Sequence, residues 1–271
     1  MQLIDGRTLA QTIRVKIKQR VAALPSSPGL AVILVGTDPA SHTYVSIKQR
    51  ACEEVGIHFE KYLYSATESE EIIIKKIREL NARKDINGIL VQLPLPNQDA
   101  DRVIAEIDPK KDVDGFHPDN ISKLKLGEPA LAPAVALGIL KLIDSTNEPL
   151  SEKTAMIISS ERFAEPISAL LREQGVASNV CPEEHSNLKE QSSQSDILIV
   201  AEGHPNFVKG DMVKPGAIVI DVGTTKVDGK LTGDVDQASV EPIAGYLTPV
   251  PGGVGPMTVA MLLENVLKAY R

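Results

Sequence analysis

Short apolar runs that alternate with helical segments constrain the fold of this chain more than any other feature. Three of these runs, rich in β-branched residues, begin 27 and 31 residues apart: Leu30–Val35, Ile57–Leu63 and Gly88–Gln92. The intervening segments 41–55 and 68–82 have helical patterns, and Gly56 is placed to end the first of them. Strand–helix–strand units of this length predict parallel strands joined by crossover helices.

A second series of apolar runs has a shorter period and predicts a second α/β domain. Its expected strands begin about 20 residues apart and cover 155–159, 176–181, 196–201 and 217–221, with helices over 165–174 and 186–191. We expect a helix over 134–144 to bridge the two domains and the two terminal helices to pack together. The predicted fold class is therefore α/β with two domains, 1–130 completed by 250–271, and 131–249.

Composition excludes several classes of protein. Hydrophobic residues make up 42% of the chain and charged residues 24%, which is typical of a globular protein. A net charge of −7 and an aromatic content of 3% argue against partners such as nucleic acid or an anionic membrane. Two cysteines and the lack of a signal-peptide pattern at the N-terminus predict a cytoplasmic protein with buried free thiols.

Three residues are candidates for acid–base chemistry or polar contacts in a cleft. Tyr44 and Lys48 lie four apart on the predicted helix 41–55, so they share one face after the carboxyl end of the first strand. A desolvated lysine exchanges protons near neutrality, although spacing alone favours an ordinary solvated one. Gln92 ends a buried strand before two prolines, where its amide either binds a cleft group or caps the exposed backbone.

The segment Lys111–Pro118 carries carboxylates in a loop. Asp108, Asp112 and Asp114 lack the spacing of a calcium loop, and no His/Cys cluster accompanies them, so no metal site is predicted. A carboxylate before glycine, as at Asp114, suits a bidentate pair with an amidine-like edge.

Two glycine-containing segments bear on ligand binding. Residues 249–256 hold three glycines and three prolines, including Pro251, Gly252 and Gly253, so we expect no regular element there. The turn after the first strand of the second domain, 156–166, has no G-x-G-x-x-G pattern, which is a weak signal for a dinucleotide. The turn at 221–225 offers a tight bend toward a ligand.

Taken together, these segments resemble the bifunctional methylenetetrahydrofolate dehydrogenase/methenyltetrahydrofolate cyclohydrolase family nearly end to end. The motifs that carry the resemblance lie at 35–41 with Tyr44 and Lys48, and at 51–57, 88–96, 111–118, 209–216, 221–223, 233–236 and 248–258. The resemblance implies a catalytic domain and a Rossmann-like dinucleotide-binding domain with a cleft between them. It also implies oxidation of 5,10-methylenetetrahydrofolate and hydrolysis of the methenyl product to 10-formyltetrahydrofolate.

The resemblance assigns roles to individual residues. Lys48 is implied as the acid/base group, Gln92 as the residue that holds it, Tyr44 as a surface for the folate rings and Asp114 as the pterin anchor. Pro251, Gly252 and Gly253 are implied as substrate-binding residues of the cleft wall. The cofactor residues carried over are Ser159, Ser160, Glu161 and Thr224, and a homodimer is expected.

The cofactor loop departs from the family pattern Gly-Arg-Ser-x-x-Val-Gly-x-Pro. This chain has Ser159-Ser160-Glu161-Arg162-Phe163-Ala164-Glu165-Pro166, so both glycines are lost and Glu161 would repel the 2′-phosphate of NADP. NADP is the family expectation and NAD a rival, since Glu183 or Glu184 is placed to accept from a ribose hydroxyl. The alternatives are a monofunctional cyclohydrolase with an eroded cofactor site, and a non-catalytic folate-binding protein.

Overall fold

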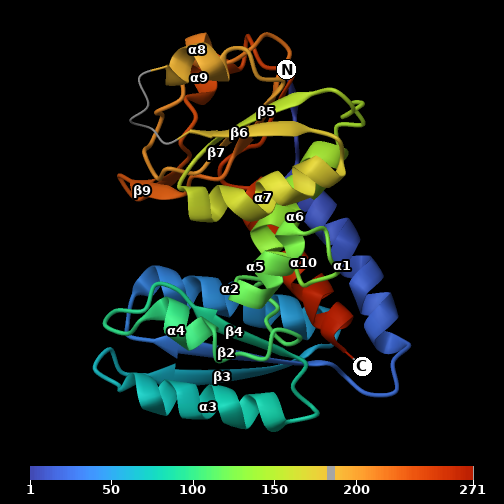
Figure 1. Ribbon diagram of the computed structural model, residues 1–271, viewed down its shortest axis with the longest axis vertical. Helices are drawn as coiled ribbons and strands as arrows, with labels where there is room; N and C mark the ends of the chain where they lie inside the picture. Colours follow the sequence, from blue (N-terminus) through green and yellow to red (C-terminus); the bar gives the residue numbers. More distant parts are fainter. Residues whose placement is uncertain (182–186, 271) are drawn as a thin grey trace. The chain divides into compact units, whose positions relative to one another are not determined.

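The computed structural model describes residues 1–181 and 187–270 and divides into two compact α/β units (Figure 1). The six-stranded unit comprises Met1–Ala10 and Val135–Thr258, and the three-stranded unit comprises Gln11–Ala134 and Val259–Arg271. Three helices contribute residues to both units: α1 (Gly6–Ala22), α6 (Ala134–Asp144) and α10 (Val254–Ala269).

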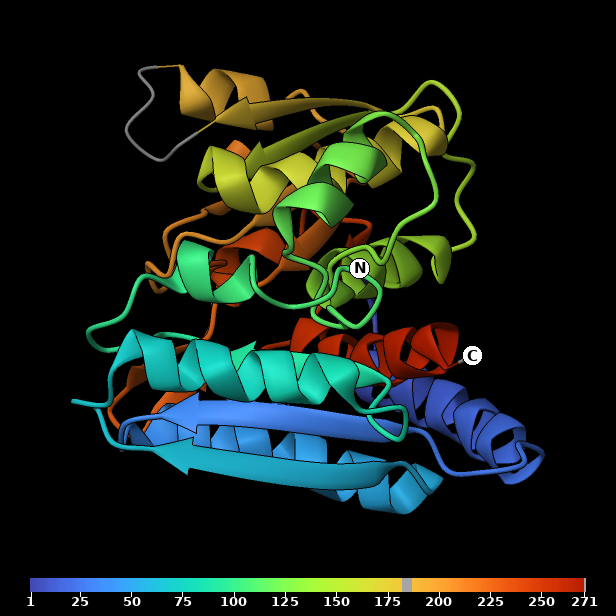
Figure 2. The ribbon, with the colours of Figure 1, turned by 60° about the horizontal axis from the view of Figure 1, so that its bottom comes forward.

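The three-stranded unit is built around a buried parallel sheet. Its strands lie in the order β3 (His58–Tyr64), β2 (Gly29–Val35), β4 (Gly88–Gln92). Helices α2 (Pro39–Val55) and α3 (Glu70–Ala82) cover opposite faces of this sheet (Figure 2). Two shorter helices follow, α4 (Ala100–Ile104) and α5 (Pro118–Lys125). All seven residues of β2 are buried, as the continuous apolar run predicts for a central parallel strand.

Helix α2 begins directly after β2 because the local sequence dictates its start. The Asp38 carboxylate accepts from the backbone N–H of Ser41 at 2.8 Å, and Pro39 occupies the first turn, where its missing N–H costs nothing. The helix ends at Gly56, which adopts φ 84° as predicted. This start places α2 at the carboxyl edge of the sheet, where parallel α/β folds bind ligands.

The six-stranded unit contains a parallel sheet in the order β1-β11-β8-β7-β5-β6. Its strands are β1 (Gln2–Leu3), β5 (Thr154–Ile158), β6 (Ala177–Cys181), β7 (Ile197–Val200), β8 (Ile218–Asp221) and β11 (Tyr246–Leu247). A separate hairpin is formed by β9 (Thr225–Val227) and β10 (Lys230–Thr232). The helices are α7 (Glu161–Glu173), α8 (Leu188–Ser192), α9 (Gln237–Val240) and the 3₁₀ turn Gly210–Met212.

The domain boundaries expected from the sequence differ from these units at the N-terminus and at 250–258, which group with the six-stranded unit and not with the three-stranded one. Strand β1 pairs in parallel with β11, so Met1–Ala10 group with the six-stranded unit instead of with 11–130. Two-residue strands carry no periodicity in the sequence, which is why this pairing was not predicted. The expected contact between the terminal helices is present, since Arg20 of α1 lies 2.7 Å from Glu264 of α10.

Helices α7 and α10 begin well before their predicted starts, and helix α8 begins after its predicted start. Helix α7 starts at Glu161, not 165, because its first turn forms ahead of Pro166, which the helix accommodates. Helix α10 starts at Val254, so the expectation of no regular element over 249–256 is wrong for its last three residues. Helix α8 covers Leu188–Ser192 with Asn187 at its N-cap, so it begins two residues later than the predicted helix over 186–191.

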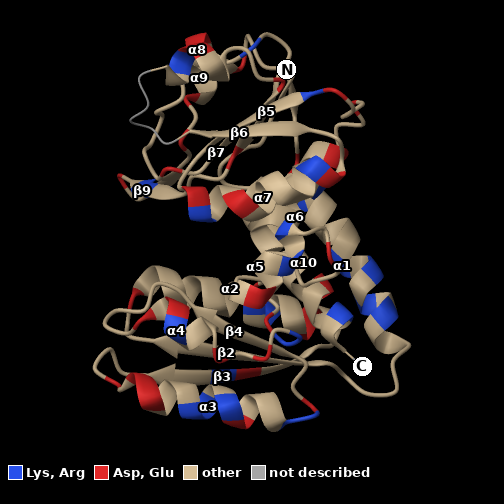
Figure 3. Cartoon of the chain, in the orientation of Figure 1, with Lys and Arg blue, Asp and Glu red and all other residues tan. Residues whose placement is uncertain are grey.

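Charged residues are absent from β2, β4, β5 and β7 and are frequent on the helices and loops (Figure 3). Uncharged and mostly apolar strands between helical layers explain the buried core of each unit. Among the described helices, none combines the length and the apolar character that a membrane span requires.

Candidate active site

Lys48 and Gln92 meet at the carboxyl edge of the three-stranded sheet. Gln92 ends β4 and lies opposite Leu34 of β2, while Lys48 lies on α2, the helix that leaves β2. The Lys48 ammonium donates to Gln92 Oε1 at 2.8 Å. The Gln92 amide nitrogen donates to the Leu93 carbonyl at 2.8 Å, so the amide is turned with its oxygen toward the lysine. Gln92 therefore holds Lys48 through its amide oxygen and caps the exposed Leu93 carbonyl through its amide nitrogen, so both interpretations of this residue apply.

Burial sets the protonation behaviour of this site. Desolvation lowers the pKa of Lys48, and the nearby Asp114 carboxylate opposes that effect. Burial also raises the pKa of Asp114, against the attraction of Lys48. One turn further along α2, burial raises the pKa of the Cys52 thiol to about 12, so this thiol stays neutral. Burial thus moves the pKa of the lysine down and the pKa of the aspartate up, so both groups are shifted toward proton exchange, whereas the thiol is shifted away from it.

A buried network shapes the loop that carries Asp114. The loop runs beside β4, because Ile89 donates to the Lys111 carbonyl and bridges to Asp112. The Asp112 carboxylate, only 1% exposed, accepts from the N–H groups of Gly115 at 3.1 Å and His117 at 2.7 Å. Asp112 therefore organises the loop, whereas Asp114 is left with its carboxylate near Lys48.

The other residues predicted to bind substrate, Tyr44 and the turn 251–253, belong to different units of the chain. Tyr44 is 41% exposed on α2, one turn before Lys48. Pro251, Gly252 and Gly253 belong to the six-stranded unit, where Gly253 donates to the Pro249 carbonyl at 2.8 Å. A side chain on Gly6 would lie 2.0 Å from the Gly253 carbonyl oxygen, so this turn packs against the start of α1. The cleft expected between the domains stays a prediction.

The six-stranded sheet has its topological switch point at β5. Strand β6 pairs on one side of β5 and β7 on the other, an arrangement that opens a crevice for a dinucleotide at the carboxyl end. Ser159 is buried there, and Ser160 and Glu161 are exposed at the beginning of α7, where helix N–H groups and dipole favour an anion. Thr224 is exposed after β8. Glu183 and Glu184, candidates for the ribose contact, lie outside the described residues.

Two buried aspartates fix the loops at this edge. Asp221, which ends β8, accepts from the N–H groups of Gly223, Asp234 and Val235 at 2.9–3.0 Å. Asp234 accepts from the N–H groups of Glu202 and Gly203, in the loop after β7. The sequence motifs at 221–223 and 233–236 are thus explained by loop geometry, and the loops stand where a dinucleotide fold places its ligand.

The burial of Asp221 makes the free energy of unfolding depend on pH, because the protonated carboxyl is favoured in the folded state. Burial raises its pKa to about 6 in the folded state, with Asp234 adding to the effect against the hydrogen bonds. Because the folded pKa exceeds that of the unfolded chain, the contribution is complete below about pH 4 and is lost as pH rises through about 6. The rise of the Asp221 pKa from its ordinary value of 3.8 to about 6 corresponds to about 3 kcal/mol of unfolding free energy.

We expect the Asp221 carboxyl carbon to titrate near pH 6 in an NMR experiment. The difference in unfolding free energy between wild type and Asp221→Asn should also shrink as pH rises from 4 to 7, because the amide does not titrate. A carboxyl midpoint below 4.5 would contradict this account.

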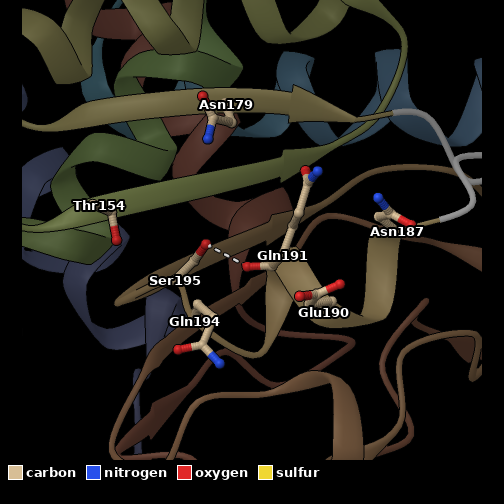
Figure 4. A pocket seen from close by; sticks show the side chains of 7 residues that line it. All are labelled: Thr154, Asn179, Asn187, Glu190, Gln191, Gln194 and Ser195. Atoms are coloured by element: carbon tan, nitrogen blue, oxygen red, sulfur yellow. Dashed lines mark hydrogen bonds between the residues drawn. The ribbon is translucent and has the colours of Figure 1, made fainter.

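A polar pocket of the six-stranded unit is lined by a different set of residues (Figure 4). It has a volume of about 470 Å³, and its lining includes Thr154 at the start of β5, Asn179 of β6 and Gln191 of α8. Among the lining residues, the Ser195 hydroxyl donates to the Gln191 backbone carbonyl at 3.1 Å. Since Thr154 and Ser159 lie at opposite ends of β5, this pocket is not the predicted cofactor site.

Both units match models of known protein families. Residues 4–114 match the catalytic domain of tetrahydrofolate dehydrogenase/cyclohydrolase, and residues 133–271 match the NAD(P)-binding domain of the same enzyme. The chain belongs to the tetrahydrofolate dehydrogenase/cyclohydrolase family. The α/β fold class and the family predicted from the sequence are both confirmed.

Individual members of the family are similar over nearly the whole chain. A bifunctional protein FolD of Dechloromonas aromatica is 48% identical over 99% of this chain and 96% of its own length. The crystal structure of the bifunctional enzyme FolD from Campylobacter jejuni superposes with a TM-score of 0.96 at 41% identity, covering 100% of this chain and 98% of that one. A Trypanosoma brucei FolD structure, complexed with NADP cofactor and inhibitor, gives 0.94 at 32% identity, covering 99% and 96%.

Proposed function

We propose that this protein oxidises 5,10-methylenetetrahydrofolate with a nicotinamide dinucleotide and hydrolyses the methenyl product to 10-formyltetrahydrofolate. The observation that carries the proposal is the Lys48–Gln92 hydrogen bond of 2.8 Å beside the half-buried Asp114. Pure binding of a folate would not need a lysine with a lowered pKa, so a non-catalytic protein is disfavoured. Matches to both family domains favour the bifunctional enzyme over a cyclohydrolase alone.

The residues of the three-stranded unit account for both steps. The dinucleotide, when bound, supplies the hydride acceptor. Asp114 pairs with the donor edge of the pterin, and Tyr44 offers its ring to the folate ring system. The methenyl product is a cation, which further disfavours the ammonium form of Lys48. Neutral Lys48 then accepts a proton as water adds to the cationic carbon, and it returns that proton when the ring opens. Gln92 keeps the amine aimed throughout.

The six-stranded unit fits a nicotinamide dinucleotide but is poorly suited to a 2′-phosphate. The switch point at β5 and the start of α7 provide the anion-binding end of a helix beside Ser159 and Ser160. Glu161 is the first residue of that helix and already places a carboxylate at its positive end. We propose that NADP binding is weakened here and that NAD competes effectively.

The two activities can be measured in one preparation. Absorbance of the reduced cofactor, followed with methylenetetrahydrofolate and either NADP or NAD, reports the dehydrogenase. Decay of methenyltetrahydrofolate absorbance reports the cyclohydrolase. We expect both activities; methenyl decay without cofactor reduction by either dinucleotide would leave only the cyclohydrolase, and neither activity would refute the proposal.

Asp114→Asn should weaken folate binding while leaving the fold intact. The amide keeps the shape of the carboxylate but turns one acceptor into a donor that faces the donor edge of the pterin. Charge-assisted hydrogen bonds contribute about 1.5–3 kcal/mol, so we expect a loss of roughly 10- to 100-fold in affinity. Titration of tetrahydrofolate against both proteins tests this, and equal affinities would remove Asp114 as the anchor.

The double substitution Ser160→Arg plus Glu161→Ser should raise affinity for NADP selectively. At an effective dielectric of about 20, each unit of like charge at about 4 Å costs up to about 4 kcal/mol before screening. We expect at least a tenfold gain for NADP, with NAD affinity and the cyclohydrolase rate within twofold. Glu173→Ser, which removes the same charge from the last residue of α7, is the matched control and should change neither affinity. Tight NADP binding by the wild type, unaffected by the swap, would show that another group such as Arg162 reads the phosphate.

We also propose that the protein acts in the cytoplasm as a homodimer formed through the six-stranded unit. The family resemblance supports the dimer, and the lack of any described membrane-spanning helix is compatible with the location. Sedimentation equilibrium tests the dimer, and fluorescence microscopy of a tagged chain tests the location.

A further inference from the structure

A single fully buried amide on the C-terminal helix holds the loop that carries Asp114. Asn265 lies on α10 with 0% exposure, among the buried apolar residues Leu262, Leu263 and Val266. Its Nδ2 donates to two backbone carbonyls, those of Val113 and Ala132, both at 2.9 Å. No polar group elsewhere on α10 is described as reaching this loop.

The two bonds of Asn265 join the chain on either side of the site. Val113 immediately precedes Asp114, so its carbonyl belongs to the peptide group that leads into the aspartate. The next carbonyl, that of Asp114 itself, accepts from the Ala134 N–H at 3.1 Å. Asn265 and Ala134 therefore fix both peptide groups around the Asp114 Cα and join this loop to residues 132–134.

The chemistry of the Asn265 side chain suits the task of binding two backbone carbonyls. An amide has two N–H donors and no charge, so it satisfies two carbonyls in an apolar surrounding without an ion to desolvate. Its Oδ1, in contrast, is buried without a hydrogen-bond partner. A buried acceptor left unpaired is unfavourable for folding, and an apolar residue at 265 would continue the apolar stripe of α10.

We infer that Asn265 is a positioning residue for folate binding, which acts by holding the main chain of Asp114 and makes no contact with substrate. This inference rests on the proposed role of Asp114 as pterin anchor. Asn265 lies 151 residues along the chain from Asp114, so the C-terminal helix takes part in the site through this one amide.

A double-mutant cycle separates positioning from packing. The variants are Asn265→Leu, Asp114→Asn and the pair, and the readout is the dissociation constant of tetrahydrofolate, with the NADP dissociation constant as a control. We expect Asn265→Leu to weaken tetrahydrofolate binding about tenfold in the wild-type background and less than twofold when Asp114 is already Asn. NADP binding should stay within twofold in all variants.

Leu263→Ala provides the matched control. It truncates an equally buried residue of the same helix, so it should lower the melting temperature yet change tetrahydrofolate affinity less than twofold. If Asn265→Leu does not fold, Asn265→Ser takes its place in the cycle, because a hydroxyl donates to only one of the two carbonyls, and we expect a smaller loss of the same kind.

The outcomes distinguish this inference from the proposed function. Unchanged affinity in Asp114→Asn would refute the anchor role and with it the basis of the inference. A normal affinity in the folded Asn265 variant, or the same loss in both backgrounds, would overturn the inference while leaving Asp114 as anchor. If Leu263→Ala weakens tetrahydrofolate binding as much as Asn265→Leu does, the effect of both substitutions comes from packing and the inference is wrong.

Discussion

Lys48→Met is expected to abolish cyclohydrolase activity in a protein that remains folded. Methionine keeps the length and apolar stem of the lysine, and residue 48 is only partly buried, so little packing is lost. The variant removes the one amine that Gln92 holds at 2.8 Å. Loss of a positioned acid/base group costs about a hundredfold or more, so methenyl decay should fall close to the uncatalysed rate.

Arg50→Met is the matched control for this substitution. Arg50 is exposed on the same helix and donates to the Ser46 carbonyl one turn earlier, so its loss removes a positive charge without touching Gln92. We expect it to retain the wild-type rate. Near-normal methenyl decay by the folded Lys48→Met variant, checked by circular dichroism, would exclude Lys48 from the mechanism.

Gly115→Ala should be the most disruptive small substitution near the site. Gly115 adopts φ +87°, and a Cβ there would lie 2.4–2.6 Å from backbone atoms of Ala132 and Pro133. Strain at positive φ costs about 1–2 kcal/mol, and displacement of packed backbone adds about 1–3 kcal/mol. The loop that carries Asp114 must shift, so we expect both a large loss of stability and a folate affinity at least tenfold weaker.

Gly127→Ala separates the two contributions. Gly127 also has a positive φ, +71°, but a Cβ there would have nothing within 4 Å. Its substitution should therefore cost only the backbone strain, with folate affinity unchanged. Urea denaturation and tetrahydrofolate titration of the two variants provide the comparison. Equal losses of stability in both would mean that the contact with Ala132 and Pro133 is unimportant.

Periodicity was enough to predict the longer strands and the long helices, but not the two- and three-residue strands β1, β9, β10 and β11. The strands at 30–35 and 88–92 and the helix at 134–144 agree with the structure to within a residue or two. The starts of α7 and α10 were misplaced because Pro166 and the Gly-Pro pair at 255–256 look like helix breakers in the sequence. Both helices accommodate them near the first turns.

Site residues could be predicted where a motif lies along one helix or strand. They could not be predicted where a side chain binds backbone groups that are distant in the sequence. Lys48 and Gln92 face each other because α2 and β4 adjoin the same strand, and parallel α/β topology implies this. The roles of Asp112 and Asn265 depend on bonds to backbone groups, which leave no pattern in the residues they hold. An asparagine inside the apolar stripe of α10 was the one available signal.

Neither unit is encoded by one continuous stretch of the gene. Strand β1 at the very start pairs with β11 near residue 246, and residues 259–271 complete the unit that begins at Gln11. On the ribosome, both units must therefore wait for the final tenth of the chain before either can close. The four segments alternate between the two units, so neither a single cut nor a circular permutation would separate them, and expression of one unit alone requires its two segments to be joined by a new linker.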